Sequence, residues 1–380
     1  MSNSISNQIA RLRLKPALMA VAAVCLLMGL WGGLARLGWM LPLLHTNLVS
    51  QHGALMLSGF LGALIALERA VALERRWAYA APALAGLGGL ALSIGLPDWI
   101  GRSLIVAGSL GLIAIFIFIV KHKPDAAHAM MGAGALLWCI GNGLWWLDGP
   151  IYHSVPWWVG FLLLTIVGER VELSRVLRLS HSLYLLLFSL VGVYVIGLLI
   201  GRAQFQMGIS VCGAALLGVS VWMLRFDIAR RTIHKSGLTR FIAACLLLGQ
   251  VWLGVAGALW LLLAQQFTAG FGYDAMLHIV LIGFVFSMIF GHAPVIVPGV
   301  LRLPFVYSPW LYAPLALLHV SLLVRLLSDA LHDAILRMWG GLFNEIAVLS
   351  FLALAVWSVL RVRKQSQSNA PAHSPLSPIS

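Results

Sequence analysis

The chain has 380 residues, of which 61% are hydrophobic and only 10% are charged, and its formal net charge is +13. A soluble domain of this length does not need so apolar a composition, so the sequence indicates a polytopic membrane protein. The four cysteines have no CxxC spacing, so neither a disulfide framework nor a thiolate metal site is indicated. Membrane topology and attraction to anionic lipid account for the positive charge, so lipid is an expected partner and nucleic acid is not.

Apolar runs of about 20 residues, each long enough to cross a bilayer as a helix, recur along the chain. They are continuous rather than alternating, which favours helices over strands. We predict an all-α fold with one transmembrane domain over 16–362, between a cytoplasmic segment 1–15 and a disordered cytoplasmic tail 363–380. About twelve helices are expected, at 16–37, 48–68, 78–97, 100–120, 125–147, 154–171, 182–201, 206–225, 238–263, 271–296, 306–327 and 336–360.

The positive charges test this topology independently, because cytoplasmic loops collect Lys and Arg. With the N-terminus inside, most of the 25 Lys and Arg residues fall on the inner segments. A missed or extra helix would scramble that alternation. The charges therefore favour twelve helices with both termini in the cytoplasm.

Two histidines stand inside predicted helices, where an ionisable side chain is costly and marks a functional candidate. His52 lies about one turn into the outer end of the second helix, and His278 lies in the outer third of the tenth. Both helices run inward, so the two rings are expected at similar depth. Two imidazoles facing each other at one depth can ligate a haem iron from both sides. Alternatively, each ring bonds a neighbouring carbonyl or loop.

His292 lies fourteen residues after His278, so the two rings share a helix face about 21 Å apart along the axis. That spacing would suit a second haem, with His128 as a partner. However, "GHAPVIVPG" places His292 just before Pro294 and Pro298, where the helix is expected to break. We prefer an interface or gating role for this histidine.

Other polar groups give further candidates. His45, His153 and His332 fall on the outer side and could supply a copper or iron site, or could simply be solvated. Glu345 lies within the last predicted helix, where a carboxylate needs a partner. It is a candidate proton-relay group, or else half of a buried salt bridge or a helix–helix hydrogen bond.

Three segments carry a family resemblance: "SQHGALMLSGFLGALI", "FLLLTIVGERVELSR" and "LHIVLIGFVFSMIFG". Twelve helices with histidines on the second and tenth resemble the haem-copper oxidase subunit I architecture. More closely, the chain looks like the NnrS family of bacterial inner-membrane proteins. It departs from both patterns, because Gln51-His52-Gly53 lacks the acidic residue expected after the histidine. No adjacent His-His pair or His-x-x-x-Tyr is present to build an oxidase copper site.

The resemblance implies a bacterial inner-membrane protein with haem b, and copper as a second candidate, that serves nitric oxide metabolism or the response to nitrosative stress. It carries over His52 and His278 as haem ligands, with nitric oxide as a small diatomic ligand and a redox partner. One alternative is a cofactor-free, proton-coupled transporter or channel that uses the histidines and Glu345 for protons or substrate. Another is an assembly factor that handles haem or copper.

Overall fold

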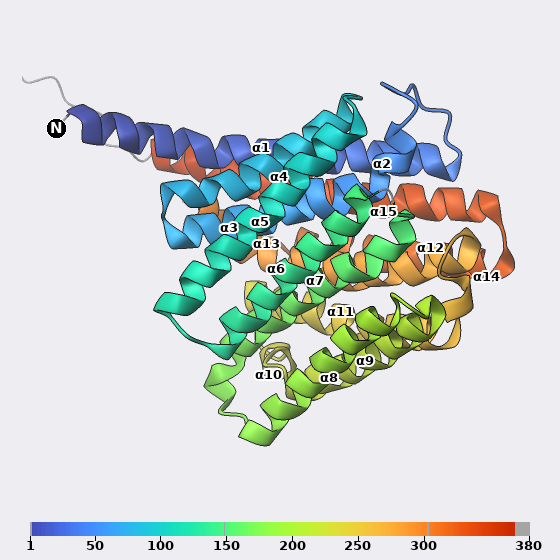
Figure 1. Cartoon of the computed structure of the whole chain (residues 1–380). Helices are drawn as coiled ribbons and strands as arrows, with labels where there is room; N and C mark the ends of the chain where they lie inside the picture. The colour runs from blue at the N-terminus through green and yellow to red at the C-terminus, as the bar shows by residue number, and fades with distance from the viewer. Residues whose placement is uncertain (1, 148, 302–303, 369–380) are drawn as a thin grey trace, which may run out of the picture.

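The computed structural model describes residues 2–147, 149–301 and 304–368, and these residues form helices without any strand. Ten helical segments among these residues are long and apolar enough to cross a membrane. The chain is therefore a polytopic helical membrane protein, as its composition predicted (Figure 1). The ten segments are Leu14–Leu37, Leu48–Leu73, Asp98–His122, Ile151–Leu177, His181–Ile200, Phe205–Phe226, Gly237–Leu262, Gly270–Val300, Pro309–Leu331 and Ala334–Val359.

Two more helices fall on predicted spans without being among these ten. They are α4 (Ala80–Ser93), on the predicted run 78–97, and α6 (Ala126–Trp146), on the run 125–147. With 14 residues, α4 is about 21 Å long and too short to cross the hydrocarbon alone. The count of twelve crossings and the cytoplasmic placement of both termini remain predictions.

Long helices extend beyond the predicted boundaries at both ends of the chain. Helix α1 (Ser2–Leu37) includes the segment that was expected to precede the first span. Helix α15 (Ala334–Ser368) continues to Ser368, so the predicted disordered tail is helical at 363–368. The rest of that tail, 369–380, lies outside the described residues.

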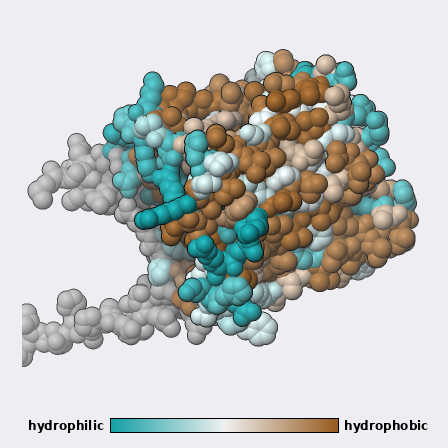
Figure 2. Space-filling view, turned by 90° about the horizontal axis from the view of Figure 1, so that it is seen from below, coloured by the Kyte–Doolittle hydropathy of each residue, from teal (hydrophilic) through white to brown (hydrophobic). Residues whose placement is uncertain are grey.

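Burial separates a central helix from lipid-facing ones. Helix α7 (Ile151–Ser174) is continued by a 3-10 turn to Leu177, and 83% of its apolar 18-residue stretch is buried inside the protein. The corresponding share in α8 (His181–Ile200) is 28%. Figure 2 shows the matching surface, a broad hydrophobic band flanked by hydrophilic residues toward the ends. Because lipid and protein interior are equally apolar, hydropathy alone does not tell these helices apart.

A buried polar network fixes α7 against its neighbours. Ser58 donates to Asn142 Oδ1 at 2.9 Å, and Trp138 Nε1 donates to the Ser58 hydroxyl at 3.0 Å. Trp158 of α7 donates its own Nε1–H to Asn142 Oδ1 at 2.9 Å. Such hydrogen bonds hold helices together in a membrane, because lipid tails offer these polar groups no hydrogen-bond partner.

The two helices that carry His52 and His278 share an irregular feature. Helix α2 (Leu48–Ala54) passes into the π-helical turn η1 (Leu55–Gly62) before α3 (Ala63–Leu73). Helix α12 (Gly270–His278) passes into the π-helical turn η5 (Ile279–Phe286) before α13 (Ser287–Leu301). Such π segments are rare and often mark functional sites, because the wider turn redirects the side chains around it.

The predicted break after His292 is wrong. Helix α13 runs through Pro294 and Pro298 to Leu301. Prolines are tolerated within membrane helices because neighbouring helices and local adjustments satisfy the backbone groups that the ring frees.

We call the end of the bundle near His52 and His278 the outer end, and the end near Arg69 and Arg170 the inner end, following the predicted topology.

Candidate functional site

The structure brings His52 and His278 together near the outer end, as expected from their predicted depth. Their ring centroids are 6.5 Å apart, and the ring planes differ by 24°. His52 comes from α2 and His278 is the last residue of α12, so each ring precedes a π-helical turn. The separation of the centroids is close to that of two imidazoles that bind one metal atom.

Each ring is oriented by a backbone carbonyl. His52 Nδ1 is 2.6 Å from the oxygen of Gly29, and His278 Nδ1 is 2.8 Å from the oxygen of Asp274. A carbonyl can only accept, so Nδ1 carries the hydrogen in both rings. In the neutral form, Nε2 of each ring then carries the free lone pair, which is the arrangement typical of metal-ligating histidines.

An ion pair supports the second ring. Arg325 of α14 (Tyr312–Leu331) donates from Nε and Nη2 to the two carboxylate oxygens of Asp274, at 2.7 and 2.8 Å. Its side chain is almost fully buried, so this bidentate geometry compensates a charge that would otherwise be expensive. Arg325 Nη2 also lies 3.3 Å from His278 Nε2. Asp274 and Arg325 therefore fix the position of the His278 ring from two sides.

A cavity of about 350 Å³ lies beside the two rings. Its size falls within the range of small-molecule sites, about 300–1,000 Å³. Its walls come mainly from α1, α2, α12, η5 and α15, and they include the predicted proton-relay group Glu345. Three cationic side chains also line it, namely Arg36, Arg325 and Arg337. The cavity thus combines two histidines with groups suited to an anionic ligand.

Gly33 on α1 leaves the space that the His52 ring occupies. A Cβ atom at this position would lie 2.8 Å from His52 Cε1 and 2.9 Å from His52 Nδ1. The ring cannot move aside freely, because Nδ1 is bonded to Gly29. We expect Gly33→Ala to destabilise the protein by about 1–3 kcal/mol, the usual effect of overpacking.

A matched substitution on α8 controls for this experiment. An added Cβ at Gly192 meets nothing within 4 Å, so Gly192→Ala should leave stability unchanged. Thermal unfolding can be followed with a thiol-reactive dye, because Cys25, Cys212 and Cys245 are buried in the folded protein. Equal melting temperatures for the two variants would show that packing of the His52 ring does not require a glycine at position 33.

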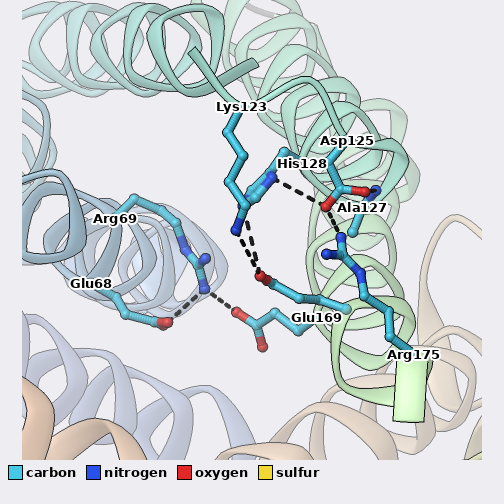
Figure 3. Close-up of polar contacts among 9 residues, drawn as sticks. Glu68, Arg69, Lys123, Asp125, Ala127, His128, Glu169 and Arg175 are labelled. Carbon is cyan, nitrogen blue, oxygen red and sulfur yellow. Dashed lines mark hydrogen bonds and ion pairs between the residues drawn. The ribbon is translucent and has the colours of Figure 1, made fainter. Parts of the chain in front are cut away.

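A second polar cluster lies at the inner end (Figure 3). Arg69 Nη2 of α3 donates to Glu68 Oε1 at 2.6 Å and to Glu169 Oε1 of α7 at 2.5 Å. His292 of α13 places Nε2 3.9 Å from Glu169 Oε2. Two carboxylates therefore share one arginine, with an imidazole beside them.

His292 and His128 do not form a second pair like the outer one. His128 Nδ1 is 3.3 Å from Asp125 Oδ2, and its Nε2 is 4.0 Å from Glu172 Oε1. His292 contacts Glu169 instead. Each ring has its own carboxylate partners, so we do not propose a haem between them.

The three outer histidines predicted as metal ligands lie against different elements. His45 is hydrogen-bonded to the backbone oxygen of Ser93 at 3.0 Å, and His153 and His332 make edge-to-face contacts with Phe205 and Phe271, respectively. Among the described residues, no group of three or more His, Cys, Asp or Glu side chains could hold a metal ion. His45, His153 and His332 therefore do not come together, and we do not carry a copper site built from them further.

Sequence reasoning missed Asp274 and Arg325 as members of the outer site. Both lie inside predicted spans, so the cost of burying a charge in a membrane could have marked them. Asp274 also stands four residues before His278, one helical turn away on the same face. Their pairing across α12 and α14 had no signal in the sequence.

A family model described as a domain of unknown function, DUF8744, matches residues 13–360. No curated protein and no solved structure matches the chain. The matched segment includes every residue that lines the outer cavity. The cavity therefore lies in the part of the chain that the family model describes.

Proposed function

The chain belongs to the DUF8744 family, and we propose that it is a haem b protein in which His52 and His278 are the axial ligands. The observation that carries the proposal is the separation of the two rings. An imidazole nitrogen binds a metal at about 2 Å and lies about 1 Å from its ring centre, so two coaxial ligands place their centroids roughly 6 Å apart. The 6.5 Å separation suits such a pair.

The surrounding groups also suit haem. In both rings Nδ1 donates to a backbone carbonyl, so Nε2 carries the lone pair that a metal would need. Arg36, Arg325 and Arg337 would hold the anionic propionates, which guanidinium groups recognise well. Arg325 Nη2 would have to give up its contact with His278 Nε2, and the N–H thus released becomes available to an anionic group. Asp274 keeps the guanidinium in place during this change.

Two histidine ligands favour electron relay over binding of a diatomic. Haem held by His52 and His278 would supply one-electron redox chemistry, and the two rings would leave no place for a diatomic such as nitric oxide. The protein's own contribution is to orient the two rings and to surround them with apolar helices. We place it in the bacterial inner membrane with twelve helices and both termini inside, as the NnrS resemblance and the charge distribution suggest.

The test is an absorption spectrum of the purified protein. The chain should be produced in haem-replete cells, extracted in mild detergent, and examined by reduced-minus-oxidised spectroscopy with pyridine haemochrome quantitation. We expect about one haem b per chain and the spectrum of a six-coordinate, low-spin iron. A folded, monodisperse preparation without a Soret band would reject the proposal.

One observation favours a second candidate, a cofactor-free proton-coupled transporter. Phe286 and Val348 line both the outer cavity and a separate cavity toward the inner end. Glu345 lies on the outer side of this partition, and Glu68 and Glu169 line the inner cavity. Ionisable groups therefore line both cavities, and the apolar side chains of Phe286 and Val348 lie between them. A path for protons through the bundle would need such an arrangement. A colourless, folded protein would make this candidate the leading one.

A further inference from the structure

The inner cavity measures about 200 Å³ and has almost entirely apolar walls. Helices α1 and α15 contribute only apolar side chains to it, among them Ala22, Leu26, Phe351 and Ala355. An apolar cavity of about 150 Å³ accepts a benzene molecule, so this one has room for a substituted six-membered ring. The walls on α3, α7 and α13 are different, because they carry the polar groups of the cavity.

Two polar atoms on these walls lack hydrogen-bond partners among the described residues. They are Thr165 Oγ1, in a residue only 2% exposed, and His292 Nε2. A buried polar atom without a partner costs roughly 1–3 kcal/mol, so such atoms are rare in native proteins and call for a bound partner. Thr165 and Glu169 are one helical turn apart on α7, and both line the cavity. The two atoms without partners therefore lie on the walls formed by α7 and α13, opposite in character to the apolar walls of α1 and α15.

The chemistry of these groups defines the head of a ligand. His292 Nδ1 is 2.7 Å from the backbone oxygen of Met288, so Nδ1 carries the hydrogen and Nε2 is an acceptor in the neutral ring. The Glu169 carboxylate beside it is also an acceptor, whereas the Thr165 hydroxyl can donate or accept. A fitting ligand thus presents hydroxyl donors toward His292 and Glu169, and an oxygen toward Thr165.

Charge argues against an anionic head such as a phospholipid phosphate or a fatty-acid carboxylate. Glu68 and Glu169 line this cavity, and Arg69 is already bonded to both of them. An anionic head would face these two carboxylates across a medium of low dielectric constant. An anionic head is therefore disfavoured, and the apolar walls suit a neutral head that carries its oxygens on a compact, mainly apolar body.

We propose that the inner cavity binds the ring of a membrane-soluble hydroquinone, with its hydroxyl groups toward His292, Glu169 and Thr165 and its apolar substituents against α1 and α15. Such a molecule combines a neutral oxygenated ring with a lipid-soluble tail, and it reaches the site from the bilayer. The site stands on its own groups and does not require haem. It shares Phe286 and Val348 with the outer cavity, so the two ligands would be neighbours.

The experiment is a binding titration of detergent-purified full-length protein with a decyl-substituted benzoquinone and with its hydroquinone form. Isothermal titration calorimetry measures the binding. We expect saturable binding of the hydroquinone form to the wild type and weaker binding of the quinone form, which has no hydroxyl donors. Thr165→Val and His292→Leu each remove one hydrogen bond, so each should raise Kd about tenfold. Ala355→Phe fills the apolar part of the cavity and should abolish binding. His319→Leu is the matched control, because His319 is buried and lines neither cavity.

The outcomes separate this inference from the haem proposal. Loss of haem in His278→Ala with hydroquinone binding retained would support the inner site independently of the outer one. Equal affinities in wild type, His292→Leu and Ala355→Phe would overturn it, as would the absence of saturable binding in folded wild-type protein. Native mass spectrometry that shows only phospholipid in the protein, not displaced by excess hydroquinone, would also overturn it.

Discussion

His278→Ala is expected to abolish haem binding, taking the haem content from about one per chain to near zero. The substitution removes one of the two imidazoles whose centroids lie 6.5 Å apart. Arg325, which lies beside this ring, can only donate and so cannot replace it as a ligand. His52→Ala should have the same effect, because the two rings make equivalent contributions. Pyridine haemochrome quantitation against protein concentration measures both.

Two controls make this test specific. His319→Ala removes a buried histidine that accepts a bond from Trp252 at 2.9 Å and lines neither cavity, so its haem content should stay unchanged. Imidazole added during expression of His278→Ala should fill the space left by the ring and restore part of the haem. Normal haem content in both His52→Ala and His278→Ala would refute the ligand assignment. A loss in His319→Ala as well would mean that the effect is one of folding.

Asp227→Asn is expected to destabilise the fold by about 3–5 kcal/mol, the cost of breaking a buried ion pair. Arg170 of α7 donates from Nε and Nη2 to the two carboxylate oxygens of Asp227, at 2.8 and 2.7 Å. The two side chains are only 5% and 2% exposed, so the substitution leaves an uncompensated guanidinium in the interior. Asn preserves the size of the side chain and an oxygen that can accept from the backbone of Ala229. The loss is therefore one of charge.

A second Asp→Asn change isolates the effect of burial. Asp98 pairs with Arg102 at 3.4 Å, but its side chain is more than a third exposed, so Asp98→Asn should cost less than about 1 kcal/mol. Replacing both members of the buried pair, as in Arg170→Met with Asp227→Leu, should recover most of the stability, because no charge is left behind. The thiol-dye melting assay compares all three variants. Similar melting temperatures for Asp227→Asn and Asp98→Asn would disprove the role of the inner pair.

The sequence predicted the spans well because their signal is local. A continuous apolar run can satisfy its backbone hydrogen bonds in lipid only as a helix, so composition and length suffice to locate it. The depth of each ring then followed from its position in a span. For the same reason His52 and His278 were expected at one level, and the structure places them as a pair.

The boundaries and irregular turns were less predictable. Pro294 and Pro298 were expected to end the helix after His292, and α13 continues through both. In water the freed backbone groups would favour a break, whereas in the bundle the neighbouring helices stabilise the helical path. The π-helical turns η1 and η5 likewise have no sequence signature, because they depend on how the flanking helices pack.

By itself, the amino-acid sequence determined that this chain is a helical membrane protein, and it predicted that His52 and His278 lie at one level. Only the tertiary structure decided which of these groups meet. It joined His278 to Asp274 and Arg325, separated His45, His153 and His332, and placed the inner cavity between α1, α7 and α15. The physical reason is that hydropathy records transfer into an apolar medium, which is the same for a lipid-facing and a protein-facing side chain. The rotation of each helix about its axis, and hence every contact across the bundle, is set by packing.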